Sequence, residues 1–219
     1  MNAGQLLPVF PLGTVLVPGL VLPLHIFEPR YRRLIDDLQS LPEDQDREFV
    51  VVAIREGREV GVEGARALFE VGTVTSVREI SALDDGRFDI VTVGTRRVRI
   101  TELDTSLPYL RASVEDVAEE SGGDTEPLAA AVAEQFVQYR SMFADDDGSS
   151  LPDDPRVLSY LVAAAVVIDL PARQALLEST TDAERLRAEL ALLRRETSLI
   201  AALPSLPAVD LVRDEPSPN

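Results

Sequence analysis

The chain has 219 residues, a hydrophobic fraction of 45% and a formal net charge of −17, with 38 acidic against 21 basic side chains. A field of that sign repels phosphate backbones and anionic lipid, so nucleic acid and membrane surfaces are not expected as partners. The sequence contains neither Cys nor Lys. Disulfides, Cys-ligated zinc, a Walker-type phosphate loop and a Ser-Lys dyad are therefore excluded.

Targeting signals are not apparent in the sequence. Residues 1–5 lack the positive segment that begins a signal peptide. The longest apolar run, Val157–Ile168, is shorter than the roughly 20 residues that cross a bilayer. The sequence therefore predicts a cytoplasmic protein.

The first half of the chain predicts β structure with one helix. Pro29 suits a first helical position, and Tyr31, Leu34 and Leu38 recur on one face of a helix that ends near Ser40. Short apolar runs between turn residues predict the strands. These runs are Leu7–Phe10, Thr14–Val17, Leu20–Phe27, Phe49–Ile54, Val71–Leu83, Arg87–Leu103 and Tyr109–Val117, with Arg66–Phe69 open between strand and loop.

Two local patterns refine this β-rich half. Asp84-Asp85-Gly86 separates the two longest runs and predicts a tight hairpin turn, because glycine supplies a positive φ. After Gly94 the residues alternate, so Val98 and Ile100 are expected on one face of the strand. The opposite face would carry Arg97, Arg99 and Thr101.

The second half changes to a helical period. Glu119–Glu126 is acidic and contains two glycines, which predicts a linker or exposed loop. An apolar stripe from Leu128 to Phe143 then predicts a helix. Val157–Ile168 is apolar nearly all round and predicts the buried central helix of a bundle, ended by Pro171. Residues 172–177 predict a short helical turn.

A last helix is expected to begin at a capping box, because Thr181 and Glu184 have its spacing. Its inner face would carry Leu186, Leu190 and Leu193. Arg185 and Glu189 could form an ion pair across one turn.

These patterns together predict an α+β fold. A β-rich lobe is expected over residues 1–119, with one short helix, and a helical bundle over residues 126–203. Residues 204–219 are rich in proline and are expected to form a flexible C-terminal tail.

Three stretches resemble the N-terminal substrate-binding domain of the Lon protease family, in the family's order. They are LPVFPLGTVLVPGLVLPLHIFEPRYRRLI at 7–35, VGTVTSVREISALDDGRFDIVTVGTRRVRI at 71–100 and LLESTTDAERLRAELALLRRET at 176–197. The resemblance implies a PUA-like pseudobarrel lobe followed by an α-helical bundle. In full-length relatives this domain helps to recognise unfolded or tagged proteins. Nothing in this sequence supplies ATPase or protease motifs, so a free-standing copy of the domain is expected.

His25 is the only histidine and the one candidate for a catalytic base. A small hydrolase would need an acid and a nucleophile beside it, and no Gly-x-Ser-x-Gly turn occurs. His25 lies inside the apolar run Leu20–Phe27, so we interpret it as a strand residue that packs beside the next helix.

Charged groups flank the helix start and a later loop. Glu28 and Arg30 could form a ligand-contacting pair, but a structural reading is favoured, in which Glu28 caps the helix and Arg30 pairs with a nearby carboxylate. Asp145–Gly148 was compared with a calcium-binding loop because it combines three acidic residues with a glycine. An EF-hand loop counted from Asp145 would need Gly and Glu where Ser150 and Arg156 stand, so a solvated loop is expected.

Arg96, Arg97 and Arg99 form a basic cluster on a predicted strand. PUA-like folds often bind RNA, which leaves a nucleic-acid-binding protein as an alternative. Three arginines without interleaved aromatic residues in an acidic chain are a poor nucleic-acid footprint. Pairing with neighbouring acids is therefore expected.

The function favoured by the sequence is a non-enzymatic protein- or peptide-binding module, acting as an adaptor or substrate-recognition factor in protein quality control. The alternatives are a PUA-like nucleic-acid binder and a small hydrolase that uses His25. No catalytic, cofactor-binding or metal-ligating residue is assigned. The ligand-contacting residues, the oligomeric state and any cooperation with a separate Lon protease stay open.

Overall fold

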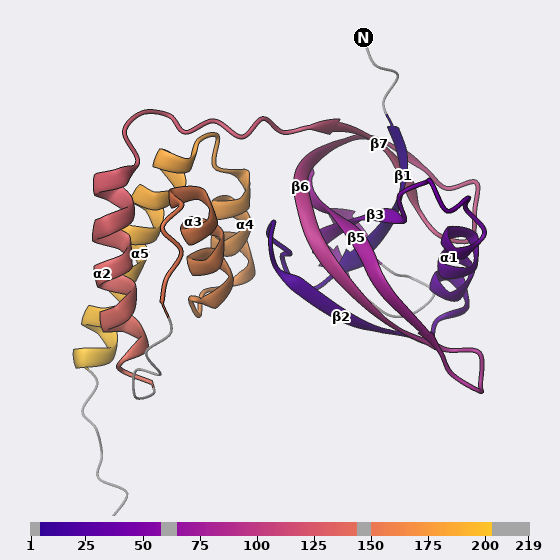
Figure 1. Ribbon diagram of the computed structural model, residues 1–219, viewed down its shortest axis with the longest axis horizontal. Helices are drawn as coiled ribbons and strands as arrows, with labels where there is room; N and C mark the ends of the chain where they lie inside the picture. The colour runs from indigo at the N-terminus through magenta and orange to yellow at the C-terminus, as the bar shows by residue number, and fades with distance from the viewer. Residues whose placement is uncertain (1–4, 58–64, 144–149, 203–219) are drawn as a thin grey trace, which may run out of the picture.

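The computed structural model describes residues 5–57, 65–143 and 150–202, which form a β lobe beside a helical bundle (Figure 1). The predicted α+β class is confirmed. The predictions for Asp145–Gly148 and for the tail at 204–219 lie outside the described residues.

The strands are β1 Gln5–Leu12, β2 Val21–Ile26, β3 Glu48–Gly57, β4 Ala65–Leu68, β5 Val71–Ala82, β6 Phe88–Asp104 and β7 Arg111–Asp116. The helices are α1 Pro29–Gln39, α2 Glu126–Arg140, α3 Pro155–Ala165, α4 Leu170–Glu178 and α5 Asp182–Ala202.

Five strands close into a barrel. The order β1-β7-β6-β5-β3 returns to its start because β1 also pairs with β3, in parallel, while the other pairs of this ring are antiparallel. β6 is long enough to pair with two different strands along its length. Its second half pairs with β7, and its first half leaves the barrel to pair with β2. The turn before β6 has Gly86 at φ +77°, as the predicted hairpin requires.

The predicted strand at 14–17 is wrong. These residues form no ladder, although Val15, Leu16 and Val17 are all buried. The Leu16 carbonyl instead accepts a hydrogen bond of 2.6 Å from the Thr73 hydroxyl of β5. The segment crosses between the two lobes, where its apolar side chains are buried without a neighbouring strand to pair with.

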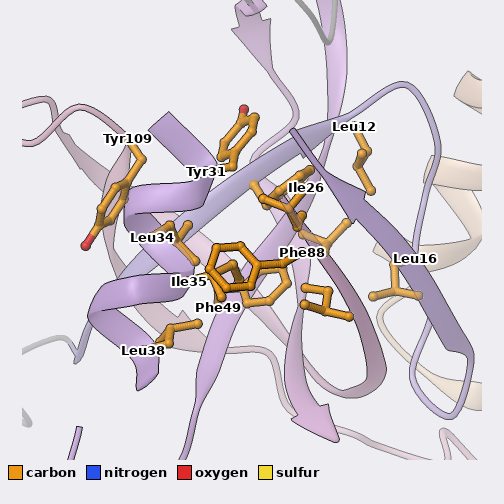
Figure 2. Packing of buried hydrophobic residues seen from close by; sticks show 13 residues of the cluster. Leu12, Leu16, Ile26, Tyr31, Leu34, Ile35, Leu38, Phe49, Phe88 and Tyr109 are labelled. Atoms are coloured by element: carbon orange, nitrogen blue, oxygen red, sulfur yellow. The ribbon is translucent and has the colours of Figure 1, made fainter. Parts of the chain in front are cut away.

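Helix α1 covers one open side of the barrel, as its amphipathic pattern predicted. Its apolar face, including Leu34, Ile35 and Leu38, is buried against the barrel core (Figure 2). The Phe10 ring of β1 stacks on Tyr31 of α1, with ring centroids 4.1 Å apart. Pro29 occupies the first turn of the helix, where a missing N–H costs nothing.

The bundle differs from the prediction at its central helix. α3 ends at Ala165 and is not buried all round, because Val157 and Leu161 are 52% and 40% exposed. Pro171 does not end α3; it lies in the first turn of α4. Asp169 explains the break, since its side chain caps α4 by accepting from the Ala172 N–H, and a cap residue must be extended.

The last helix starts as predicted. The Thr181 hydroxyl accepts from the Glu184 N–H, and the Glu184 carboxylate reaches back to the Thr180 N–H. The predicted Arg185–Glu189 ion pair does not form. Arg185 binds Asp182 and the Ser159 hydroxyl instead, because Asp182 lies one turn away and also faces α3.

The two lobes share a hydrophobic core. Val15, Val17 and Val71 of the β lobe pack with Tyr160 of α3 and Leu176 of α4, among others. Figure 1 shows the bundle on the side of the barrel opposite α1.

The connection between the lobes is itself paired, although it was predicted as a linker or exposed loop. Glu120 forms a parallel bridge with Thr181, and the carbonyls of Glu120 and Ser121 accept from the first N–H groups of α5. The segment thus caps a helix while it connects the lobes. Among the described residues, no helix combines the length and the apolar character needed to cross a membrane.

Candidate functional site

A hollow of about 160 Å³ lies where the end of β1, the end of β2 and the start of α1 meet. We call it the Phe27 hollow. Its walls are mostly apolar, and Phe10, Leu24 and Tyr31 are among the side chains that line it. Phe27 stands at the hollow with 47% of its surface exposed. Figure 2 shows Tyr31, Ile26 and Leu12 along one border of the barrel core.

The hollow exists because β2 lies outside the five-stranded barrel. In the described part of the chain β2 pairs with β6 alone, so its other edge has no strand beside it. Leu22 and Leu24 face the core from this edge strand but stay only partly buried. Pro23 suits such an edge, because proline has no N–H to donate to a further strand. The open side of β2 therefore uncovers core-facing apolar groups.

Charges at the helix side of the hollow are neutralised. The Glu28 carboxylate pairs with the Arg30 guanidinium at 3.0 Å. Glu28 is the N-cap residue of α1, yet its side chain makes no capping hydrogen bond, so the predicted cap is wrong and the predicted pairing of Arg30 with a nearby carboxylate is confirmed. The hollow is thus apolar on one side and charge-balanced on the other.

His25 lines the same hollow and holds two polar partners. Its Nδ1 lies 2.6 Å from Asp89 Oδ1, and its Nε2 lies 3.1 Å from Arg87 Nη1. A guanidinium can only donate, so Nε2 must accept and Nδ1 carries the proton that binds Asp89. A Ser-His hydrolase needs its nucleophile at Nε2, where this protein has an arginine. No described hydroxyl is hydrogen-bonded to the imidazole.

The arginines of β6 are paired with acids, as expected. Arg96 bonds Glu48 and Asp116, and Arg99 bonds Glu70. Burial opposes the charge of Arg96, but the bond to Glu48 and then that to Asp116 outweigh it and raise the pKa of Arg96.

Arg97 is buried, with a relative exposure of 1%, and bonds Glu119 beneath the bundle. It is therefore not accessible to a phosphate backbone. Across residues 5–57, 65–143 and 150–202, no group of three or more acidic or histidine side chains could hold a metal ion.

Sequence reasoning did not find the Phe27 hollow. Phe27 closes an apolar run just before Pro29, and the same pattern would fit a fully buried strand end. Exposure of Phe27 and Leu24 depends on the missing neighbour of β2, which no local pattern reveals. A run with Pro23 inside it was the one available signal, because it predicts an edge strand.

Comparison with known proteins defines the class. The sequence matches the family described as the ATP-dependent protease La (LON) substrate-binding domain over residues 6–195. The chain belongs to this family, and the predicted resemblance is confirmed.

Among curated relatives, the chain is similar to Lon protease 2 of Syntrophobacter fumaroxidans, with 30% identity over 78% of this chain and 22% of that protein. It is also similar to Lon protease 2 of Thermus thermophilus, with 30% identity over 90% of this chain and 25% of that protein. The chain thus spans about a quarter of the length of these relatives.

Solved structures show the same fold. The N-terminal domain of the Mycobacterium avium complex Lon protease aligns with a TM-score of 0.66 and 22% identity, covering 89% of this chain and 98% of that one. A Lon N-terminal domain protein from Xanthomonas campestris aligns with a TM-score of 0.59 and 21% identity, covering 91% and 99%.

Proposed function

We propose that this chain is a non-enzymatic module that binds polypeptide segments and presents them as an adaptor or substrate-recognition factor in protein quality control. The observation that carries the proposal is the Phe27 hollow beside an unpaired strand edge. Membership of the Lon substrate-binding family supports the same conclusion.

The size of the hollow suits one apolar side chain of a partner. Apolar cavities of about 150 Å³ hold a molecule the size of benzene. A volume of about 160 Å³ between Phe10, Leu24 and Tyr31 would therefore accept one leucine or aromatic side chain. Folded proteins bury such side chains, so the hollow would select polypeptides that expose them.

A binding role also explains the polar rim. Glu28 is neutralised by Arg30, and the imidazole of His25 is held by Asp89 and Arg87. These groups are occupied with one another and offer no free nucleophile beside the hollow. Apolar burial would supply the affinity, at roughly 25 cal/mol for each Å² removed from water.

The test compares two exposed phenylalanines. Phe27→Ser should weaken binding of a labelled, permanently unfolded polypeptide at least about tenfold, because a central apolar anchor contributes more than about 1 kcal/mol. Phe143→Ser is the matched control, since Phe143 is 61% exposed on the bundle, away from the hollow. Fluorescence anisotropy gives both affinities, and thermal unfolding confirms that both variants fold.

Equal binding by the wild type and by Phe27→Ser would refute the assignment of the site. Equal loss in both variants would indicate non-specific adhesion to apolar surface. The unmodified, natively folded protein from which that unfolded polypeptide is prepared should not bind.

A further inference from the structure

The backbone of β2 points alternately towards β6 and towards an open edge. In an antiparallel ladder, every second residue turns its N–H and its C=O to the same neighbouring strand. The Gly94 N–H donates to the Leu20 carbonyl at 3.0 Å, and the Thr92 hydroxyl donates to the Leu22 carbonyl at 3.0 Å. Leu22 and the other even-numbered residues of β2 therefore turn their backbone groups towards β6.

The odd-numbered residues Val21, Pro23 and His25 turn their backbone groups the other way. Among the described strands only β6 pairs with β2, so these groups meet no neighbouring strand (Figure 1). Pro23 agrees with this assignment, because the N–H that proline lacks would have pointed to the open edge. The edge thus offers the N–H groups of Val21 and His25 and the carbonyl oxygens of all three residues.

This edge has little of the protection that soluble proteins give to an open strand. Charged side chains, prolines and bulges usually prevent a further strand from pairing there. The β2 sequence VLPLHI contains no Lys, Arg, Asp or Glu, and no bulge interrupts its described ladder with β6. Pro23 removes one donor from the edge but keeps its carbonyl oxygen. Val21 is 56% exposed, so the start of the edge is open to solvent.

A strand added to this edge would direct side chains into the Phe27 hollow. Leu24 and Ile26 line the hollow from the core face of β2, whereas the His25 imidazole bonds Asp89 on the opposite face. Directly opposed residues of an antiparallel pair carry their side chains on the same face. Every second residue of the added strand would therefore face the hollow.

Backbone recognition and charge together define the partner. Hydrogen bonds to N–H and C=O groups do not depend on the partner's sequence, which suits a module that binds many unfolded chains. The net charge of −17 repels acidic segments. The matching partner is an extended segment that has apolar residues at alternate positions and no acidic residue.

We propose that an unfolded polypeptide adds to β2 as an antiparallel strand, with its backbone bonded to Val21 and His25 and one apolar side chain in the Phe27 hollow. The inference rests on the proposed function and specifies the class of segment bound at that site. Antiparallel pairing is the arrangement that β2 already has with β6, and it is slightly more stable per residue than parallel pairing.

Hydrogen exchange of the β2 amides tests the proposal on the full chain. The probe is a neutral, end-capped Thr/Ser-rich peptide that carries one Leu and one Phe two positions apart. In the free protein the Val21 and His25 amides should exchange quickly, and those of Leu22 and Leu24 slowly. Saturating peptide should slow Val21 and His25 at least about tenfold, because only these amides gain a partner. Leu22 and Leu24 should change much less.

Backbone methylation of the peptide tests the antiparallel arrangement. Its Leu and Phe would face the hollow with their own N–H groups pointing away from β2, and the residues between them would donate to β2. N-methylation of the residues before Leu and before Phe should weaken binding at least about tenfold, because two hydrogen bonds are lost. The isomeric peptide, N-methylated at Leu and Phe, is the matched control and should bind within about threefold of the parent peptide.

Failure of the strand addition can be distinguished from failure of the proposed function. If Phe27→Ser weakens binding while Val21 and His25 exchange as in the free protein, strand addition is overturned and the hollow remains the binding site. Equal slowing of all four β2 amides, or equal affinity of the two methylated peptides, also overturns strand addition. If Phe27→Ser binds as the wild type does and no β2 amide is slowed, both the site and the strand addition are refuted.

Discussion

Glu189 of α5 is a carboxyl group buried inside the bundle. It is 1% exposed, and neither carboxylate oxygen has a hydrogen-bond partner among the residues that the structure describes. Burial raises the pKa of Glu189 well above its usual value, and the charge of Arg185 opposes this shift only in part. The helical spacing of the two residues had predicted an ion pair. Sequence spacing could not show that Asp182 and Ser159 would occupy Arg185 first.

Glu189 should make stability fall as pH rises. A carboxyl group whose pKa is raised in the folded state binds its proton more tightly there than in the unfolded chain. Its cost is absent below the unfolded value near 4.5 and grows as pH rises towards the folded value. Glu189→Met should therefore stabilise the protein by about 1–3 kcal/mol near pH 8, and by less near pH 5.

Denaturant unfolding at the two pH values measures this difference. Glu134→Met is the control, since Glu134 is an exposed residue of α2. This substitution should change the free energy of unfolding by the same amount at both pH values. A loss of stability in Glu189→Met would show that the carboxyl group finds a partner in solution, and a gain independent of pH would show that folding does not raise its pKa.

At the scale of elements, β6 pairs with three other strands and also contacts the helical bundle through Arg97. Alternation after Gly94 correctly placed Arg97 and Arg99 on the face opposite Val98, but it could not distinguish the two arginines. Helix α4 packs over Arg97 and leaves Arg99 at the surface. Arg97 then donates to the carbonyls of Leu177 and Ser179 at the end of α4, each at 2.7 Å. It thereby satisfies helix-terminal carbonyl groups that otherwise lack partners.

Arg97 should hold the two lobes together. Arg97→Met would leave Glu119 with the Tyr160 hydroxyl as its remaining donor at Oε1 and would take the guanidinium away from these two carbonyls, at a cost of about 3–5 kcal/mol. Arg99→Met removes an exposed pair with Glu70 from the same strand and should cost less than about 1 kcal/mol. Chemical unfolding of the two variants measures how much unfolding free energy each one loses. Similar losses would mean that the buried cluster does not join the lobes.

At the scale of the whole molecule, the sequence predicted the α+β class but not how the two lobes meet. Hydrophobic period two before residue 118 and period 3.6 after residue 125 predicted the β lobe and the bundle, and the strands and helices lie accordingly. The shared core was not predicted, because Val15 and Val17 contact Tyr160 and Leu176 across more than 140 positions of sequence. Such contacts leave no local periodic signal.

The site was less predictable than the fold. Exposure of Phe27 and of the open side of β2 follows from which strands are neighbours, and among the described strands β2 pairs with β6 alone. His25 was interpreted as a residue that packs in a strand. It lies on β2 as expected, but it faces Asp89 and Arg87 on the surface.

Locating a bound polypeptide on the molecule tests the proposed binding site most directly. NMR signals of the full chain would be followed while the neutral Leu- and Phe-containing peptide is added. The shifts should cluster at Leu24, Phe27 and Tyr31, and the signals of the bundle residues Phe143 and Leu199 should not change. Shifts confined to the bundle, or spread evenly over exposed apolar residues of both lobes, would contradict the proposed binding site.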